Sequence, residues 1–180
     1  MNRKEILRDK ALAYLLEHGI ADLSLRPLAE QIGTSARLLI FHFGSKDGLI
    51  TEVMDEVRRR VQQSFIALMR DAGGKGGLKL FWQWSTHANN SPYVRLLYEV
   101  QVLAMQNPSV YVPYMDATSS TWLSFVESTL PPSPQRRVTA TLCVAVIDGL
   151  MLEYLSTGDL SRTTSALEIF ASLLAHAHSK

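Results

Sequence analysis

The chain has 180 residues, of which 47% are hydrophobic and 19% charged, and its formal net charge is +1. That length suits one or two small domains, and the composition is that of a globular protein, which argues against intrinsic disorder. The nearly neutral charge gives nucleic-acid binding no support by itself, so such a function has to rest on the local placement of basic residues. The single cysteine, Cys143, excludes a disulfide within one chain.

No segment predicts a secretion signal or a membrane span. The first ten residues, MNRKEILRDK, are too charged for a signal peptide. The longest apolar run is interrupted at Asp148, well short of the about 20 residues that a membrane-spanning helix needs. We therefore expect a soluble, cytoplasmic protein, a setting that also agrees with the low cysteine content.

Glycine and proline are clustered and leave long segments between them that favour helices, while no stretch alternates as a strand would. Apolar residues recur every fourth position along Leu49, Val53, Val57, Val61, Phe65 and Met69. We predict an all-α fold of about nine helices, with a flexible loop at residues 73–77. Gly19 and Gly158 are expected to end helices, and three cap–proline pairs to begin them: Ser91–Pro92, Asn107–Pro108 and Ser133–Pro134.

Residues 20–46, IADLSLRPLAEQIGTSARLLIFHFGSK, carry the pattern of a helix-turn-helix. Ser24 is suited to cap one short helix and Ser35 a second, and Gly33 supplies a turn of about three residues between them. The major groove of DNA is wide enough for one such helix, which enters with its N-terminal end leading.

The second helix carries side chains that suit base recognition. Leu39 and Phe43 are four residues apart and should face the core, which turns Arg37, Ile40 and Phe41 outward. Arg37 suits a guanine edge or a phosphate, and the two apolar side chains suit thymine methyl groups or sugars. Each residue alone also fits a solvated surface or ordinary packing, and it is their joint placement that favours DNA.

This segment resembles the tetracycline-repressor (TetR) family of bacterial transcription regulators. The resemblance spans roughly residues 3–57 and rests on a glycine-ended first helix followed by SLRPLAEQIG, SARLLIFHF and GSKDGLI in that order. It implies a three-helix DNA-binding domain, residues 1–48, and a helical-bundle domain for ligand binding and dimerisation, residues 49–180. We expect a repressor that a small molecule releases from a palindromic operator.

Matched position by position, the family implies DNA contacts from ten residues. Two of them depart from the family: Ile40 stands where tyrosine is usual, and Leu38 where threonine is common, so we expect Arg37 to carry more of the binding. Residues 1–48 hold seven basic and six acidic groups, which predicts a shallow salt dependence. The implied base or sugar contacts are Ser35, Ala36, Arg37, Leu38, Ile40, Phe41 and His42, and the implied phosphate contacts are Ser24, Arg26 and Lys46.

For residues 49–180 the resemblance implies a homodimer through the last two helices and a cavity between the middle helices. Small and apolar residues near the C-terminus suit a two-fold helical interface, with the candidates Leu142, Val146, Gly149, Leu150, Leu167, Phe170 and Leu174. The aromatic middle segments suit a small apolar or aromatic effector, with the candidates Phe81, Trp84, His87, Tyr98, Met105, Tyr114 and Trp122. The alternative is that both sets complete the core of a monomer.

Two other classes of function stay open. An enzyme has little support, because the sequence contains no HxxxH, ExxH, CxxC or GxSxG motif. His176 and His178 lack further ligands nearby, so we expect no metal and no cofactor. A helical adaptor that binds proteins without DNA specificity is the main alternative. Among regulators, the lack of an acidic tail favours repression over activation.

Overall fold

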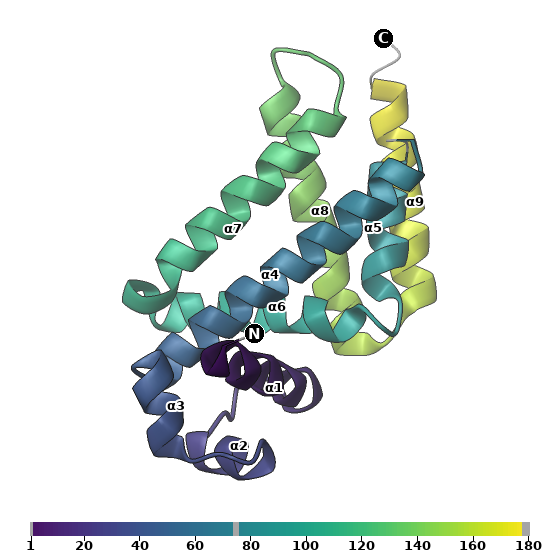
Figure 1. The fold of residues 1–180 in the computed structure, drawn as a ribbon. Coiled ribbons are helices and arrows are strands. Elements are labelled where there is room, and N and C mark those ends of the chain that lie inside the picture. The colour runs from purple at the N-terminus through teal and green to yellow at the C-terminus, as the bar shows by residue number, and fades with distance from the viewer. Residues whose placement is uncertain (1, 74–75, 178–180) are drawn as a thin grey trace. The chain divides into compact units, whose positions relative to one another are not determined.

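The computed structural model describes residues 2–73 and 76–177, and all regular secondary structure in that part of the chain is helical (Figure 1). The all-α prediction is confirmed. Gly74 in the predicted loop and His178 at the end of the chain lie outside the described residues. The described helices are α1 (Arg3–His18), α2 (Leu25–Gln31), α3 (Ala36–Phe43), α4 (Lys46–Asp71), α5 (Gly77–Thr86), α6 (Ser91–Gln106), α7 (Pro108–Thr129), α8 (Arg136–Thr157) and α9 (Leu160–Ala177).

The chain divides into two compact units. The first unit consists of Met1–Gln63 and Ser91–Ala117, and the second of Ser64–Asn90 and Thr118–Lys180. α4 continues without a break through the position between residues 48 and 49, where the sequence predicts a functional boundary. That boundary separates roles rather than compact bodies, and it stays a prediction.

In the first unit, α6 holds the C-terminal end of α1. α1 ends at Gly19, whose φ of +79° suits glycine. Arg95 on α6 donates to the carbonyl of Leu16 at 2.8 Å, and the carboxylate of Glu99 accepts the N–H of Ile20 at 2.5 Å. A Cβ at position 19 would lie 3.0 Å from that carboxylate, so glycine is required here for two reasons.

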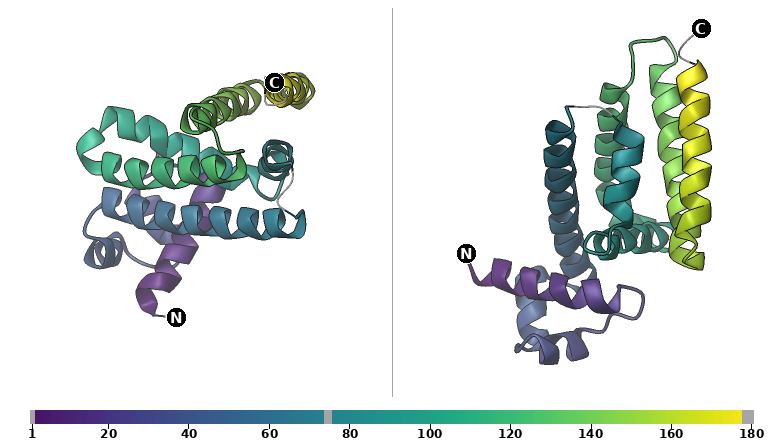
Figure 2. Two further views of the ribbon diagram at one scale, coloured as in Figure 1. Left: turned by 90° about the horizontal axis from the view of Figure 1, so that it is seen from above. Right: turned by 90° about the vertical axis from the view of Figure 1, so that its right-hand side faces the viewer.

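The second unit is built around α5, α8 and α9, which pack on one another; α8 and α9 lie side by side (Figure 2). The glycine at position 158 ends α8 as predicted. The predicted start of α8 at Ser133–Pro134 is wrong, because the helix begins at Arg136. The carbonyl of Ser133 instead accepts the N–H of Arg136 in a turn, and the Arg136 guanidinium donates to the carbonyl of Glu127 at 2.6 Å.

The fourfold apolar repeat of α4 is buried along its whole length, from Leu49 to Met69, as its spacing predicts. α8 is different, because it is long and apolar enough to cross a membrane, while only 22% of its most apolar window is buried. A single helix of this kind is weak evidence for a membrane span, since core and interface helices have the same composition. Its exposed apolar face bears instead on self-association.

Candidate nucleic-acid interface

Two short helices of the first unit form the predicted helix-turn-helix. α2 begins after Ser24 and ends at Gln31, and α3 begins after Ser35. Gly33 has a φ of +72°, and the N–H of Thr34 donates to the carbonyl of Ala29 at 2.8 Å, which closes the turn. α2 and α3 pack against each other, so the turn fixes their crossing.

The two predicted cap residues differ in what their hydroxyls do. The Ser35 hydroxyl accepts the N–H of Leu38 at 3.2 Å, which caps α3. Ser24 has the extended backbone of a cap residue, but its side chain makes no capping hydrogen bond. The exposed Ser24 hydroxyl is therefore free of that helix end and suits a phosphate oxygen.

α3 faces two ways, as its sequence predicts. Leu39 and Phe43 are buried, while Arg37 is exposed. Ile40 is 41% exposed and Phe41 78% exposed. An arginine and two apolar side chains thus share the solvent side of a short helix whose other side is anchored in the core.

The end of α3 lies very close to the start of α4. Gly44 ends α3 with a φ of +77°. The Ser45 hydroxyl then accepts the N–H of Gly48 at 2.9 Å and caps α4. A Cβ at position 48 would lie 2.1 Å from the carbonyl oxygen of Phe43, so only glycine permits this approach. The position of α3 is therefore tied to the first turn of α4.

Basic residues near α3 have two different roles. Lys4 pairs with Glu52, and its ammonium lies 5.4 Å from the centre of the Phe43 ring, so it supports α3 from the inside. Arg26 and Arg37 are exposed, and no ion pair engages them within the described residues. The second group is the one available to DNA phosphates and bases.

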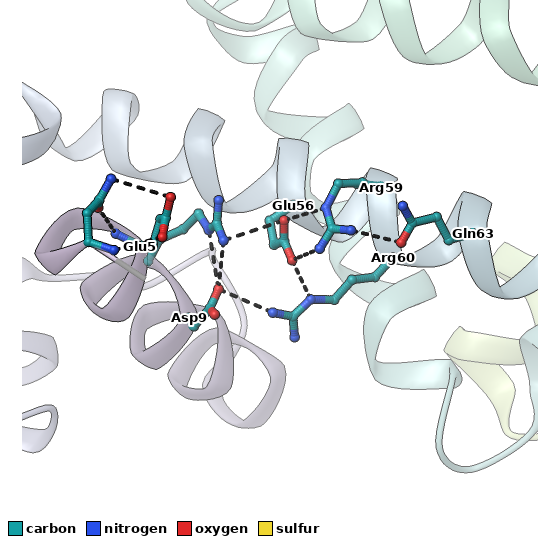
Figure 3. Close-up of polar contacts among 8 residues, drawn as sticks. Glu5, Asp9, Glu56, Arg59, Arg60 and Gln63 are labelled. Atoms are coloured by element: carbon teal, nitrogen blue, oxygen red, sulfur yellow. Dashed lines mark hydrogen bonds and ion pairs between the residues drawn. The ribbon is translucent and has the colours of Figure 1, made fainter.

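A buried carboxylate joins α1 to α4. Glu56 is only 4% exposed and accepts hydrogen bonds from Arg59 at 2.5 and 2.8 Å and from Arg60 at 2.6 Å (Figure 3). Arg60 also bonds to Asp9 of α1 at 3.2 Å, and Arg8 lies 3.6 Å from Glu56. These five residues, here called the Glu56 network, connect the DNA-binding head to α4.

The Glu56 network strongly favours the ionised carboxylate. The hydrogen bond from Arg59 lowers the pKa of Glu56 most, and burial opposes it by raising the pKa. Arg60 and Arg8 lower it further, so the pKa falls from 4.5 to about 2. Ionised Glu56 thereby stabilises the packing of α1 on α4 at neutral pH.

A second polar link reaches the first turn of α4 from α7. The hydroxyl of Tyr111, a buried side chain, donates to the carboxylate of Asp47 at 2.6 Å. Burial, and then the hydrogen bond to Asp47, raise the pKa of Tyr111 well above its usual range, so the phenol stays protonated as a donor. Asp47 directly follows Lys46, one of the predicted phosphate contacts.

All ten predicted DNA-contact residues lie in the first unit, on or beside α2, α3 and the start of α4. Their accessibility fits the prediction unevenly, and the contacts themselves stay a prediction. The exposed members are Ser24, Arg26, Ser35, Arg37, Ile40, Phe41 and Lys46, and the half-buried members are Ala36, Leu38 and His42.

The predicted effector-binding residues divide between the two units. Phe81, Trp84 and Trp122 meet around Phe65 in the second unit, where Phe125 completes an aromatic cluster. The ring centres of the other four lie between 5.1 and 6.1 Å from that of Phe65. Tyr98, Met105 and Tyr114 lie in the first unit. His87 and Met105 are exposed.

The predicted interface residues lie on α8 and α9, mostly at the surface. Leu142 is 52% exposed and Gly149 is also exposed, whereas four others are half-buried: Val146, Leu150, Phe170 and Leu174. Leu167 is 1% exposed, so the chain's own helices already cover it. An open groove of about 440 Å³ runs beside Ile169 and Leu173 on α9, two exposed residues that the prediction omits.

Sequence reasoning missed the residues that hold the head in place. The spacing of Glu56, Arg59 and Arg60 is visible in the sequence as an i, i+3 and i+4 pattern. Nothing in the sequence indicates that Asp9 joins them, or that Tyr111 reaches Asp47 from 64 positions away. Both links depend on how α1 and α7 pack on α4.

Three comparisons with known proteins agree with this architecture. Residues 7–53 match the family model of bacterial regulatory proteins of the tetR family. The transcriptional regulator BetI of Stenotrophomonas maltophilia is 26% identical over 156 residues, which cover 83% of this chain and 80% of that protein. A transcriptional regulator of Rhodococcus has a TM-score of 0.81 at 19% identity, covering 98% and 97% of the two chains. A regulator of Saccharomonospora viridis in complex with choline has a TM-score of 0.78 at 17% identity, covering 94% and 95%.

Proposed function

Because the chain belongs, through residues 7–53, to the tetR family of bacterial regulatory proteins, we propose that it is a cytoplasmic transcriptional repressor. In this proposal a homodimer binds a palindromic operator and a small apolar or aromatic effector releases it. The role is regulatory and not enzymatic, in keeping with relatives that are transcriptional regulators.

The observation that carries the proposal is the solvent side of α3. Arg37, Ile40 and Phe41 are exposed on a helix that a serine caps and a glycine turn positions. Arginine pairs with guanine and apolar side chains contact thymine, so this surface suits the major groove. Exposed Arg26 and Lys46 flank the helix and suit phosphates.

A dimer is supported by the apolar surface of the second unit. α8 exposes Val138, Leu142 and Leu152, and α9 exposes Ile169 and Leu173. Contiguous apolar surface of this kind marks interaction sites in soluble proteins. Pairing these helices around a two-fold axis would place two recognition helices on half-sites roughly 34 Å apart, one turn of DNA.

The effector site is proposed at the aromatic cluster around Phe65. Aromatic faces bind apolar molecules and attract cations, and one structural neighbour holds choline. Phe65 belongs to α4, the helix that begins directly after α3. An effector that binds better to a state with a displaced Phe65 shifts the population away from the operator-binding state.

Selection of bound sequences from a random duplex pool tests the regulator. Enrichment of a palindrome with half-sites about one helical turn apart is the expected result. A folded helical dimer that enriches no sequence at low salt, in a preparation stripped of bound small molecules, would favour the protein-binding adaptor instead.

Tryptophan fluorescence tests the effector site. Trp84 and Trp122 belong to the cluster, whereas Trp82 packs on Tyr154 and donates to Thr164 at 2.8 Å. Choline and a panel of aromatic compounds serve as probes. Ligands are expected to change the emission of Trp82→Phe and to change it less in Trp84→Phe. Release from the operator by a sugar phosphate alone would contradict the proposed effector class.

A further inference from the structure

Phe41 is exposed to an extent that its own fold does not explain. It is 78% exposed, while every other phenylalanine, tyrosine and tryptophan among the described residues is buried or half-buried. Its nearest ring partner is the half-buried His42, whose ring centre lies 5.2 Å away in an edge contact. The ring therefore contributes little to the core and is available to a ligand.

The neighbours of Phe41 indicate what that ligand is. Arg37 precedes it by four residues, so both side chains lie on the same face of α3. Ile40 beside it is 41% exposed. In the major groove the one apolar group on a base edge is the 5-methyl group of thymine, and phenylalanine is among the side chains that contact it. Phosphates and sugars offer this ring no comparable surface.

The helix geometry sets the distance between the two contacts. Four residues advance about 6 Å along an α-helix. Stacked bases are about 3.4 Å apart, so this advance corresponds to about two base pairs when α3 follows the groove. Arg37, nearer the N-terminal end of α3, reads one base, and Phe41 contacts another about two steps away.

We propose that Phe41 determines operator specificity by contacting the methyl group of one thymine in each half-site, about two base pairs from the guanine that Arg37 contacts. This inference rests on the proposed function and adds to it the chemical group that is read. It also accounts for base recognition by a helix that has isoleucine and leucine at positions 40 and 38.

Replacing thymine by deoxyuridine removes only the methyl group and tests this contact. The operator from the selection is made with one thymine at a time replaced in both half-sites, and binding is measured by fluorescence anisotropy. One methyl group is expected to change affinity about 4-fold, and its loss from both half-sites about 15-fold. A single thymine position is expected to respond in this way.

Three variants assign the effect to the ring. Phe41→Ala should bind the normal operator more weakly and show no further loss with deoxyuridine, because the contact is already gone. Phe41→Leu should keep part of the sensitivity. Ile66→Ala removes an exposed apolar side chain elsewhere, 55% exposed on α4, and should behave as the wild type does.

The outcomes separate this inference from the proposed function. Equal deoxyuridine sensitivity in Phe41→Ala and wild type, or no sensitive thymine in an enriched palindrome, overturns the inference while the regulator stands. Enrichment of no sequence overturns both, because there is then no base to read. A sensitive thymine more than three or so base pairs from the guanine overturns the proposed spacing.

Discussion

Replacing Glu56 by glutamine should weaken the first unit substantially at neutral pH. The variant keeps the shape of the side chain and removes the charge that Arg8, Arg59 and Arg60 surround. Lowering the pKa from 4.5 to about 2 corresponds to about 3 kcal/mol of stability, at 1.36 kcal/mol for each tenfold change. Removal of one partner from a buried ion pair has a cost of this size, about 3–5 kcal/mol.

The sign of the pH dependence follows from the lowered pKa. The folded protein holds Glu56 ionised more readily than the unfolded chain, so this stabilisation is complete above pH 4.5 and is lost as the pH falls toward 2. At about pH 3, about 2 of the about 3 kcal/mol are gone. The difference between wild type and Glu56→Gln should therefore shrink from about 3 kcal/mol at neutral pH to about 1 kcal/mol at pH 3.

The assay has to report on the first unit. Trp82, Trp84 and Trp122 all lie in the second unit, so fluorescence would miss the effect. Urea unfolding followed by circular dichroism, with hydrogen exchange of the α1 amides, measures it. Glu153→Gln is the matched control, because Glu153 pairs with Arg162 at an exposed site and should change little. A variant as stable as wild type at neutral pH, or a difference that does not shrink with acid, would refute the reasoning.

Three further predictions concern DNA binding and assembly. Ser35→Ala removes the cap of α3 and should cost about 1 kcal/mol in the free energy of unfolding, and an unchanged urea midpoint would speak against a capping role. Arg37→Ala should cost about 1–3 kcal/mol at one operator position, whereas Lys46→Ala should weaken all DNA alike and reduce the salt slope by about 0.9; anisotropy titrations that find no effect of either change would mean that α3 docks differently. Leu142→Glu should yield monomers by sedimentation while Ile66→Glu does not, and dimers of both variants would place the interface elsewhere.

The sequence determined the local features of this protein, because they depend on neighbours along the chain. The spacing of apolar residues predicted the buried stripe of α4, and Gly19, Gly33 and Gly158 marked turns that the structure contains. The side of α3 that faces solvent followed from Leu39 and Phe43 alone. Local signals failed at Ser133–Pro134, where a turn that packs on the end of α7 delays the start of α8.

The tertiary structure decided which distant residues meet, since those contacts depend on helix packing and not on spacing. It brought Asp9 to Arg60 and Tyr111 to Asp47, and neither pair is visible in the sequence. It also separated residues that the sequence grouped by composition. Phe81 joins the aromatic cluster around Phe65, while Tyr98 belongs to the other unit. An aromatic side chain has the same hydropathy wherever it lies in the chain, and only packing decides which rings share a core.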